Sequence, residues 1–402
     1  MSHRREYLVF SEAGKLVFST AAEDGWSLAQ VSVMHALLAL FAGESPGDEL
    51  RQIELADGSG ATRISFMSVA PLHLACISSH DEPALLVHAR LRLLHDAVVS
   101  LVSKTKLDAL MRKAPGFDLR RVIGDTDTYL AGVVRDMHAQ LPGGVRVRRV
   151  DPALRRELAA ASEPVGLQGV LYVLVVQDGA LVSLCHPKRH RAHVCDLQLL
   201  MAMVAHGPER GARDAWFPMC LPHFAPHGFV YVYVSPMDAG HVVMVSTRPD
   251  GYVAAQGWRA TLSGARCFGE LGRGDYGADE LGIPGLRDFV YIARRAAQHT
   301  ATGPHSVLYE HGVSALCGRS DARLRPALDA FTGREPPVAA PLHVQYYRTD
   351  EAAVLAWQTG ALTLCITVSP WLAKSAVVDA ANRVAGWVRQ HEKELFLTAH
   401  TF

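Results

Sequence analysis

The chain has 402 residues, of which 49% are apolar and 20% are charged, and this composition excludes a largely disordered protein. At roughly 100 to 200 residues per domain, its length predicts two to four modest domains rather than one core. Forty basic residues balance forty acidic ones, so no overall charge attracts the chain to nucleic acid or to an anionic membrane. Nucleic acid is therefore not an expected partner, and any membrane contact has to be local.

The cysteines and the hydropathy indicate a cytosolic protein. The seven cysteines are an odd number without a CxxC pair, and most of them lie in apolar runs, which predicts buried and reduced thiols. No run reaches the ~18 apolar residues that span a bilayer. The basic N-terminus leads into an apolar stretch that is too short for a signal peptide. We expect a cytoplasmic protein that reaches membranes only peripherally.

The first third of the chain predicts two strands, a helix, three strands and a second helix. Val31, Met34 and Leu38 have the spacing of one helical face, and Gly43 and Pro46 end that helix. Short apolar runs separated by turn residues predict the strands. The expected strands are residues 7–10, 15–19, 50–55, 62–69 and 72–78, and the expected helices are residues 26–41 and 85–101.

The same order of elements returns twice, less clearly the second time. One unit of roughly 120 to 140 residues therefore occurs three times, as an ancient duplication would leave it. The second unit comprises strands 170–176, 181–185, 216–221, 229–235 and 241–246 with helix 194–205. The third comprises strands 289–292, 307–309, 343–348, 353–358 and 362–368 with helices 324–331 and 373–388.

Several short runs resemble the SAND family, which includes the Mon subunit of the Mon/Ccz complex. They are VFSEAGK at 9–15, FDLRR at 117–121, CLPHF at 220–224 and EKELFL at 392–397, and the similarity extends from residue 7 to residue 402 in unbroken order. The resemblance implies an α+β fold of three longin-like domains, each a five-stranded antiparallel sheet flanked by helices. We assign the first longin domain to 1–141, a connector to 142–166, the second to 167–270 and the third to 271–402.

The resemblance also implies a function. A SAND protein pairs with a Ccz-like longin subunit, and the heterodimer exchanges guanine nucleotide on a late-endosomal or vacuolar Rab GTPase at an anionic phosphoinositide membrane surface. Exchange needs no nucleophile and no cofactor, because the factor binds the nucleotide-free GTPase better than the loaded one. The absence of GxSxG, GxxxxGK[ST] and HExxH motifs is consistent with this, so we expect no covalent catalysis and no cofactor.

The first predicted helix contains no Asp, Glu, Lys or Arg from residue 26 to residue 42. A helix that packs on a sheet by one face normally carries charge on the other face. We expect the uncharged outer face to contact the partner or the Rab, although a cover formed by the chain's own later domains stays open. The predicted contact residues, including the loop before the helix, are Glu23, Asp24, Trp26, Ser32, His35, Ala36, Leu37, Ala39 and Leu40.

The loop of residues 185–195 carries two kinds of candidate side chains. Lys188, Arg189 and Arg191 form a small basic cluster, which we predict to contact anionic lipid headgroups, with a solvated loop as the alternative. Five residues are of types that bind zinc, but their spacing matches no standard zinc finger, so we predict no metal. These five are Cys185, His186, His190, His193 and Cys195.

A further basic cluster is predicted to lie on a solvated linker and helix face. Its members are Arg146, Arg148, Arg149, Arg155 and Arg156. Three alternative functions stay open. They are a related subunit of the exchange complex of lysosome-related organelles, a longin scaffold or adaptor without exchange activity, and a metal-dependent enzyme that uses the loop of residues 185–195.

Overall fold

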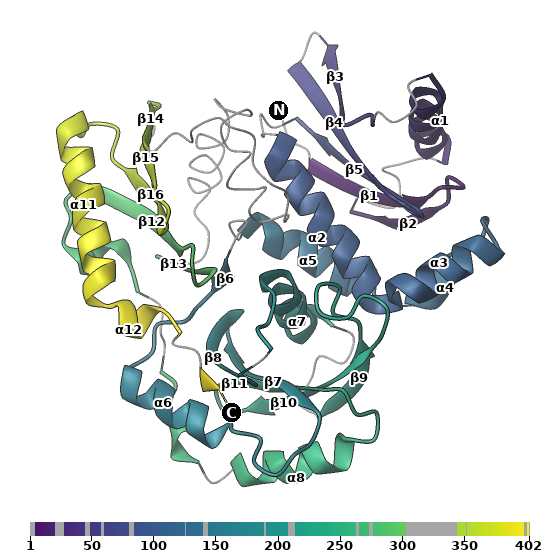
Figure 1. The fold of residues 1–402 in the computed structure, drawn as a ribbon. Helices are drawn as coiled ribbons and strands as arrows, with labels where there is room; N and C mark the ends of the chain where they lie inside the picture. The colour runs from purple at the N-terminus through teal and green to yellow at the C-terminus, as the bar shows by residue number, and fades with distance from the viewer. Residues whose placement is uncertain are drawn as a thin grey trace.

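The computed structural model describes most of the chain, and its elements form three sheets with helices between and outside them (Figure 1). The described residues are 5–20, 28–44, 49–57, 60–79, 84–124, 126–139, 144–188, 190–207, 214–262, 265–272, 276–302, 344–350, 352–397 and 400–401. Within them, every helix is too short or too polar to cross a bilayer.

The first domain is an antiparallel sheet between two helices. Its strands are β1 (Arg5–Ser11), β2 (Leu16–Ser19), β3 (Gln52–Asp57), β4 (Gly60–Val69) and β5 (Leu72–Ser78), in the order β2-β1-β5-β4-β3. Helix α1 (Leu28–Glu44) packs on one face and α2 (Ala84–Val102) on the other. Side chains of β1 alternate between the two faces, with Leu8 and Phe10 facing α1 and Tyr7 and Val9 facing α2.

Three helices that the sequence analysis did not predict complete the first domain. They are α3 (Lys104–Lys113), α4 (Arg120–Ile123) and α5 (Asp127–Ala139). Helix α5 crosses α7 (Val194–His206) of the second domain closely at Gly132, where an added Cβ would lie 2.2 Å from Cγ of His206. The His206 ring also bonds the Asp136 carboxylate at 3.0 Å. Glycine is therefore required at this helix crossing.

The second domain has five strands of its own and a sixth from the end of the chain. The strands are β7 (Val170–Gln177), β8 (Ala180–His186), β9 (Ala215–Met219), β10 (Val230–Met237) and β11 (Gly240–Ser246), and β17 (His400–Thr401) adds parallel to β8. Helix α7 covers one face. Helices α6 (Pro152–Ala161) and α8 (Tyr252–Leu262) cover the other, and the short helix η1 (Arg266–Phe268) follows α8.

The third domain also gains a sixth strand from elsewhere. Its described strands are β12 (Leu286–Ala293), β13 (Gln298–Ala301), β14 (Val344–Arg348), β15 (Ala353–Gln358) and β16 (Leu362–Val368), and β6 (Val145–Arg146) adds parallel to β13. Helix α11 (Lys374–Gln390) covers one face, with η2 (Ala278–Leu281) and α12 (Glu392–Leu395) beside it. The expected strand 307–309 and helix 324–331 lie outside the described residues.

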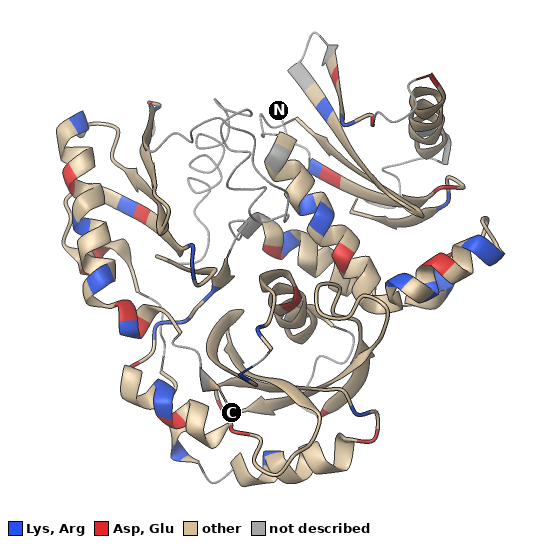
Figure 2. Cartoon of the chain, viewed as in Figure 1, with Lys and Arg blue, Asp and Glu red and all other residues tan. Residues whose placement is uncertain are grey.

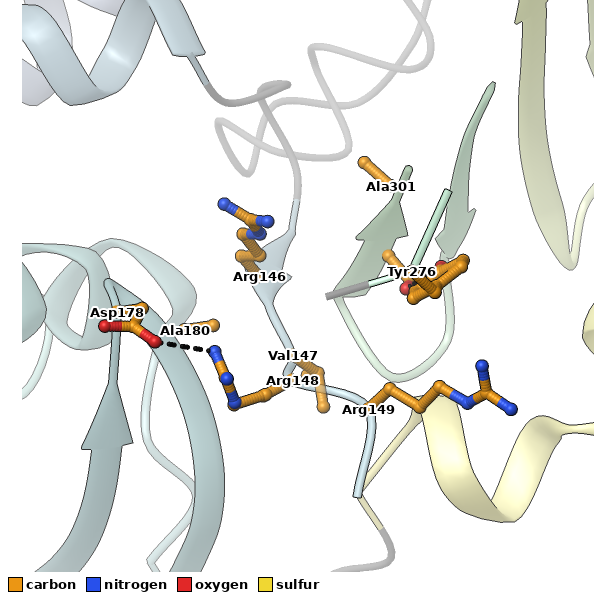
Figure 3. A pocket seen from close by; sticks show the side chains of 9 residues that line it. Arg146, Val147, Arg148, Arg149, Asp178, Ala180, Tyr276 and Ala301 are labelled. Atoms are coloured by element: carbon orange, nitrogen blue, oxygen red, sulfur yellow. Dashed lines mark hydrogen bonds and ion pairs between the residues drawn. The ribbon is translucent and has the colours of Figure 1, made fainter. Parts of the chain in front are cut away.

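The segment that joins the first two domains is packed between all three, which contradicts the prediction of a solvated basic linker. Figure 3 shows its arginine side chains leaving the backbone in different directions. Arg148 is buried and bonds the Asp178 carboxylate at 3.0 Å. Arg149 pairs with Glu280 at 2.8 Å and with Glu394 at 2.9 Å. These ion pairs hold the segment against the second and third domains.

Arg155, at the start of α6, makes the densest set of contacts in this junction. Its side chain is buried and donates hydrogen bonds to five backbone carbonyls, which belong to Arg148, Val182, Lys393, Glu394 and Phe396. Burial lowers the pKa of Arg155 to about 10, against the opposing charge of Glu394. The guanidinium therefore remains charged at neutral pH while it joins the linker, β8 and the end of the third domain.

Replacing Arg155 by Met is expected to destabilise the protein by roughly 3 to 5 kcal/mol, because the buried carbonyls lose their donors. Urea unfolding of the purified chain measures this change. Arg156→Met is the matched control, since Arg156 is exposed and, among the described residues, its side chain donates to the carbonyl of Pro152 in its own helix. Its effect should stay within about 0.5 kcal/mol. Equal midpoints for the two variants would contradict the role of Arg155.

A buried histidine on β13 makes the stability sensitive to acid. Burial, and then the charge of Arg146, lower the pKa of His299 to about 4. The unfolded chain binds a proton near pH 6.5 and the folded chain does not, so stability is complete above that pH and falls as the pH drops toward 4. The loss from this residue approaches roughly 3 kcal/mol.

His299→Gln is therefore expected to flatten the dependence of unfolding free energy on pH between about 6.5 and 4. Half-buried histidines such as His73 and His88, whose pKa burial also lowers, preserve part of the slope. His227→Gln, at an exposed position, is the control and should leave the slope unchanged. Parallel curves for the wild type and His299→Gln would show that His299 does not contribute.

Candidate partner-binding surface

Helix α1 is held on the first sheet by its apolar inner face. Val31, Met34 and Leu38 are buried against Leu8 and Phe10 of β1 and against further side chains of the same sheet. Their spacing of three and four residues places them on one side of the helix, as the sequence predicted. The inner face therefore needs no other partner.

The outer face of α1 is also apolar, and it is exposed. Val33, Leu37 and Leu40 have 59%, 38% and 61% of their surface exposed, and Ala36 lies exposed between them. Their spacing of three and four residues makes a continuous strip along the helix, which we call the α1 ridge. Figure 2 shows α1 without charge except at its end, where Glu44 stands.

The chain's own later domains do not cover this ridge in the described structure. Helix α1 lies at the outer edge of the first domain, on the side of the sheet away from α2 and the other two domains (Figure 1). Among the described residues, neither the second nor the third domain buries the ridge, which argues against the alternative that the chain's own later domains cover it. Contact with a separate protein stays a prediction.

The predicted contact residues are five exposed ones, three outside the described residues, and the half-buried His35. Ser32, Ala36, Leu37, Ala39 and Leu40 are exposed, as expected. Glu23, Asp24 and Trp26 lie outside the described residues. Val33 was missed, although its helical spacing with Leu37 and Leu40 could have placed it on the same face.

His35 does not lie on the outer face, which corrects the expectation from the sequence. Its ring is half-buried, and Nε2 lies 2.6 Å from the carbonyl oxygen of Glu12 in the β1–β2 turn. An added Cβ at Gly14, whose φ is 72°, would lie 3.4 Å from the same ring. His35 thus holds the turn against α1, and contact of its half-buried ring with a partner stays a prediction.

The basic loop between β8 and α7 is only partly described. Lys188 and Arg191 are exposed, and Arg191 bonds the carbonyl of Arg295 in the third domain at 3.4 Å. Arg189 lies outside the described residues. The two described cations are available to anionic headgroups, and lipid binding by this loop stays a prediction.

The five metal-ligand residue types of the same loop do not converge. Cys185 lies on the α6 side of the sheet, where its thiol donates to the carbonyl of Ala159 at 3.5 Å. His190 contacts the ring of Phe224, and His186 bonds Pro187. Only His193 and Cys195 stay together, and they meet His223 from the β9–β10 loop. The spacing argument against a site made of all five residues is therefore consistent with the structure.

Comparison with known proteins gives matches in all three domains. Residues 5–131, 168–261 and 285–392 match the first, second and third longin domains of FUZ, MON1 and HPS1. These matches confirm the predicted α+β fold of three longin domains.

Similar proteins cover nearly the whole chain. Vacuolar fusion protein MON1 of Cryptococcus neoformans var. neoformans serotype D (strain JEC21) is 32% identical over 98% of this chain and 64% of its own length. Vacuolar fusion protein MON1 homolog B of Homo sapiens is 26% identical, over 98% of this chain and 76% of its own. The chain thus spans just under two thirds of the fungal relative. It belongs to the family of three-longin proteins that includes FUZ, MON1 and HPS1.

Proposed function

We propose that the chain is one half of a heterodimeric guanine-nucleotide exchange factor, which uses the α1 ridge to bind a Ccz-like longin subunit and, together with it, a late-endosomal or vacuolar Rab GTPase. The names of its relatives support a role in vacuolar and endosomal trafficking. Partner, GTPase and exchange activity belong to the proposal.

The observation that carries the proposal is a comparison of α1 with α7. Both helices follow the first two strands of their domains, and both are almost free of charge. In α7 the outer face is buried, because α2 and α5 of the first domain pack on it. In α1 the corresponding face is exposed. The same kind of helix is covered by a neighbouring domain in one case and lacks its cover in the other.

An exposed helix elsewhere in the chain shows what a solvent face looks like. Helix α11 buries Val377 and Val384 against the third sheet, while Asp379 and Arg383 are exposed on its outer side. Such charge is the normal complement of an apolar inner face. The α1 ridge departs from this pattern, and burial of one such Leu or Val side chain is worth about 1.5 to 3 kcal/mol.

A binding surface of this kind suits nucleotide exchange. The ridge supplies no acid, base or nucleophile, so it acts only through contact. A heterodimer accelerates exchange when its differential affinity favours the nucleotide-free GTPase over the loaded one. The ridge would provide part of that contact, and the partner subunit would provide the rest.

Membrane recruitment is the weaker part of the proposal. Lys188 and Arg191 are both exposed in one loop, and a basic side chain near an anionic surface contributes about 1 kcal/mol. Two such residues give weak attraction, so phosphoinositide binding would depend on the partner or the GTPase as well.

The test is the release of a fluorescent GDP analogue from a panel of Rab GTPases. We expect acceleration of a late-endosomal Rab by the chain co-expressed with its Ccz-like subunit, and little by the chain alone. A stable heterodimer that accelerates no Rab would replace exchange with a scaffold function, and acceleration of a Rab from lysosome-related organelles alone would favour the related complex.

Within that assay, the double variant Leu37→Asp/Leu40→Asp is expected to lose the partner on co-purification or to slow GDP release at least about tenfold, because carboxylates would be buried in the contact. The control is Val253→Asp on α8, where Val253 is 76% exposed. Both proteins should keep the unfolding temperature of the wild type. Unchanged binding and release by a folded double variant would exclude the ridge as the contact.

A further inference from the structure

Three side chains of metal-binding types meet where the first and second domains pack together. His193 precedes α7, Cys195 lies in its first turn, and His223 comes from the loop between β9 and β10. One ligand atom from each lies within 4.8 Å of the others. We call these residues the interdomain triad.

The triad is compact and partly closed to solvent. The rings of His193 and His223 are stacked, with centroids 3.9 Å apart and planes at 15°. Cys195 is buried, whereas the side chain of His223 is 33% exposed. A small ion therefore has a route to the site past His223.

Carboxylates beside the triad fix its geometry and favour a cation. Nε2 of His223 lies 3.0 Å from the Asp96 carboxylate of α2, which leaves Nδ1 of that ring as the nitrogen for a ligand. A carboxylate behind a histidine in this way orients metal-binding rings in proteins. Oδ1 of Asp196 accepts a hydrogen bond from the backbone N–H of His223 at 3.2 Å. Its other carboxylate oxygen, Oδ2, is buried and has no hydrogen-bond partner among the described residues.

We propose that His193, Cys195 and His223 bind one Zn²⁺ ion, with water as the fourth ligand. Imidazole nitrogen and thiolate sulfur are the donors that zinc prefers, and four-coordinate sites with such ligands are common in proteins. The ion would hold α7 and the β9–β10 loop of the second domain together, and through Asp96 it would tie them to α2 of the first domain.

Zinc binding needs a deprotonated cysteine sulfur and unprotonated imidazole nitrogens. Acid protonates these ligands, so the ion is expected to be released as the solution becomes acidic.

The test is metal binding by the full chain, with its partner subunit where that is needed for solubility. The purified protein should contain about one zinc per chain by elemental analysis. Titration of the chelator-treated protein with Co²⁺ should give a thiolate-to-cobalt absorption band. Zinc affinity is then measured by competition with a chromophoric chelator.

Cys195→Ser should abolish the cobalt band, and His223→Asn should weaken zinc binding at least tenfold. Asp96→Asn should weaken zinc binding by about 10- to 100-fold, as loss of an orienting carboxylate does. Cys185→Ser is the control, since this buried thiol lies off the site and bonds Ala159. If Cys195→Ser does not fold, the more exposed His223 still provides a test. Absence of bound zinc and cobalt, or binding that both Cys195→Ser and His223→Asn leave unchanged, would overturn the proposal.

Discussion

The arrangement of the second and third domains depends on one buried guanidinium. Arg155 donates to carbonyls of the linker, of β8 and of the segment around α12. The last carbonyls of a helix have no partner within the helix, so Lys393, Glu394 and Phe396 need an external donor where the chain buries them. All five acceptors are main-chain carbonyl oxygens, which cannot turn away as a side chain can. A rotamer change therefore cannot compensate for the loss of the Arg155 guanidinium. The third domain is thereby fixed to the sheet of the second.

The first domain is attached differently, through a continuous apolar core. The layers run from α1 through the first sheet to α2 and α5, then to α7, the second sheet, and α6 with α8. Only the outermost layers face solvent in such a stack. At one end α6 exposes Arg156 and Glu157, as a solvated helix does. Helix α8 beside it exposes one large apolar side chain, Val253. At the other end α1 exposes three large apolar side chains in the α1 ridge, and our proposal places the partner at that end.

Local patterns in the sequence predict much of this fold, but they do not predict its long-range contacts. Hairpins, apolar strands and the face of α1 with Val31, Met34 and Leu38 follow from spacing alone. The burial of Arg155 does not, because a basic run usually marks a solvated segment. One of its acceptors, the carbonyl of Arg148, lies 7 residues away, but the other four lie 27 to 241 residues away. His223 is likewise separated from Cys195 by a helix and a strand, so no motif joins them. The sequence analysis placed His35 on the outer face of α1, but its ring contacts the carbonyl oxygen of Glu12, in a turn 23 residues earlier in the chain.

These attachments determine how a partner on α1 would be oriented. The ridge lies on the opposite face of the first sheet from α2, and α2 is packed into the core that continues to the second domain. The Asp96–His223 bond adds a polar contact across the same junction. Little freedom is left between the ridge and the second domain, or between the second domain and the third. A subunit bound to the ridge would therefore be held at a defined angle to the whole chain, and selectivity for a GTPase can arise from the fixed geometry of two surfaces rather than from any single side chain.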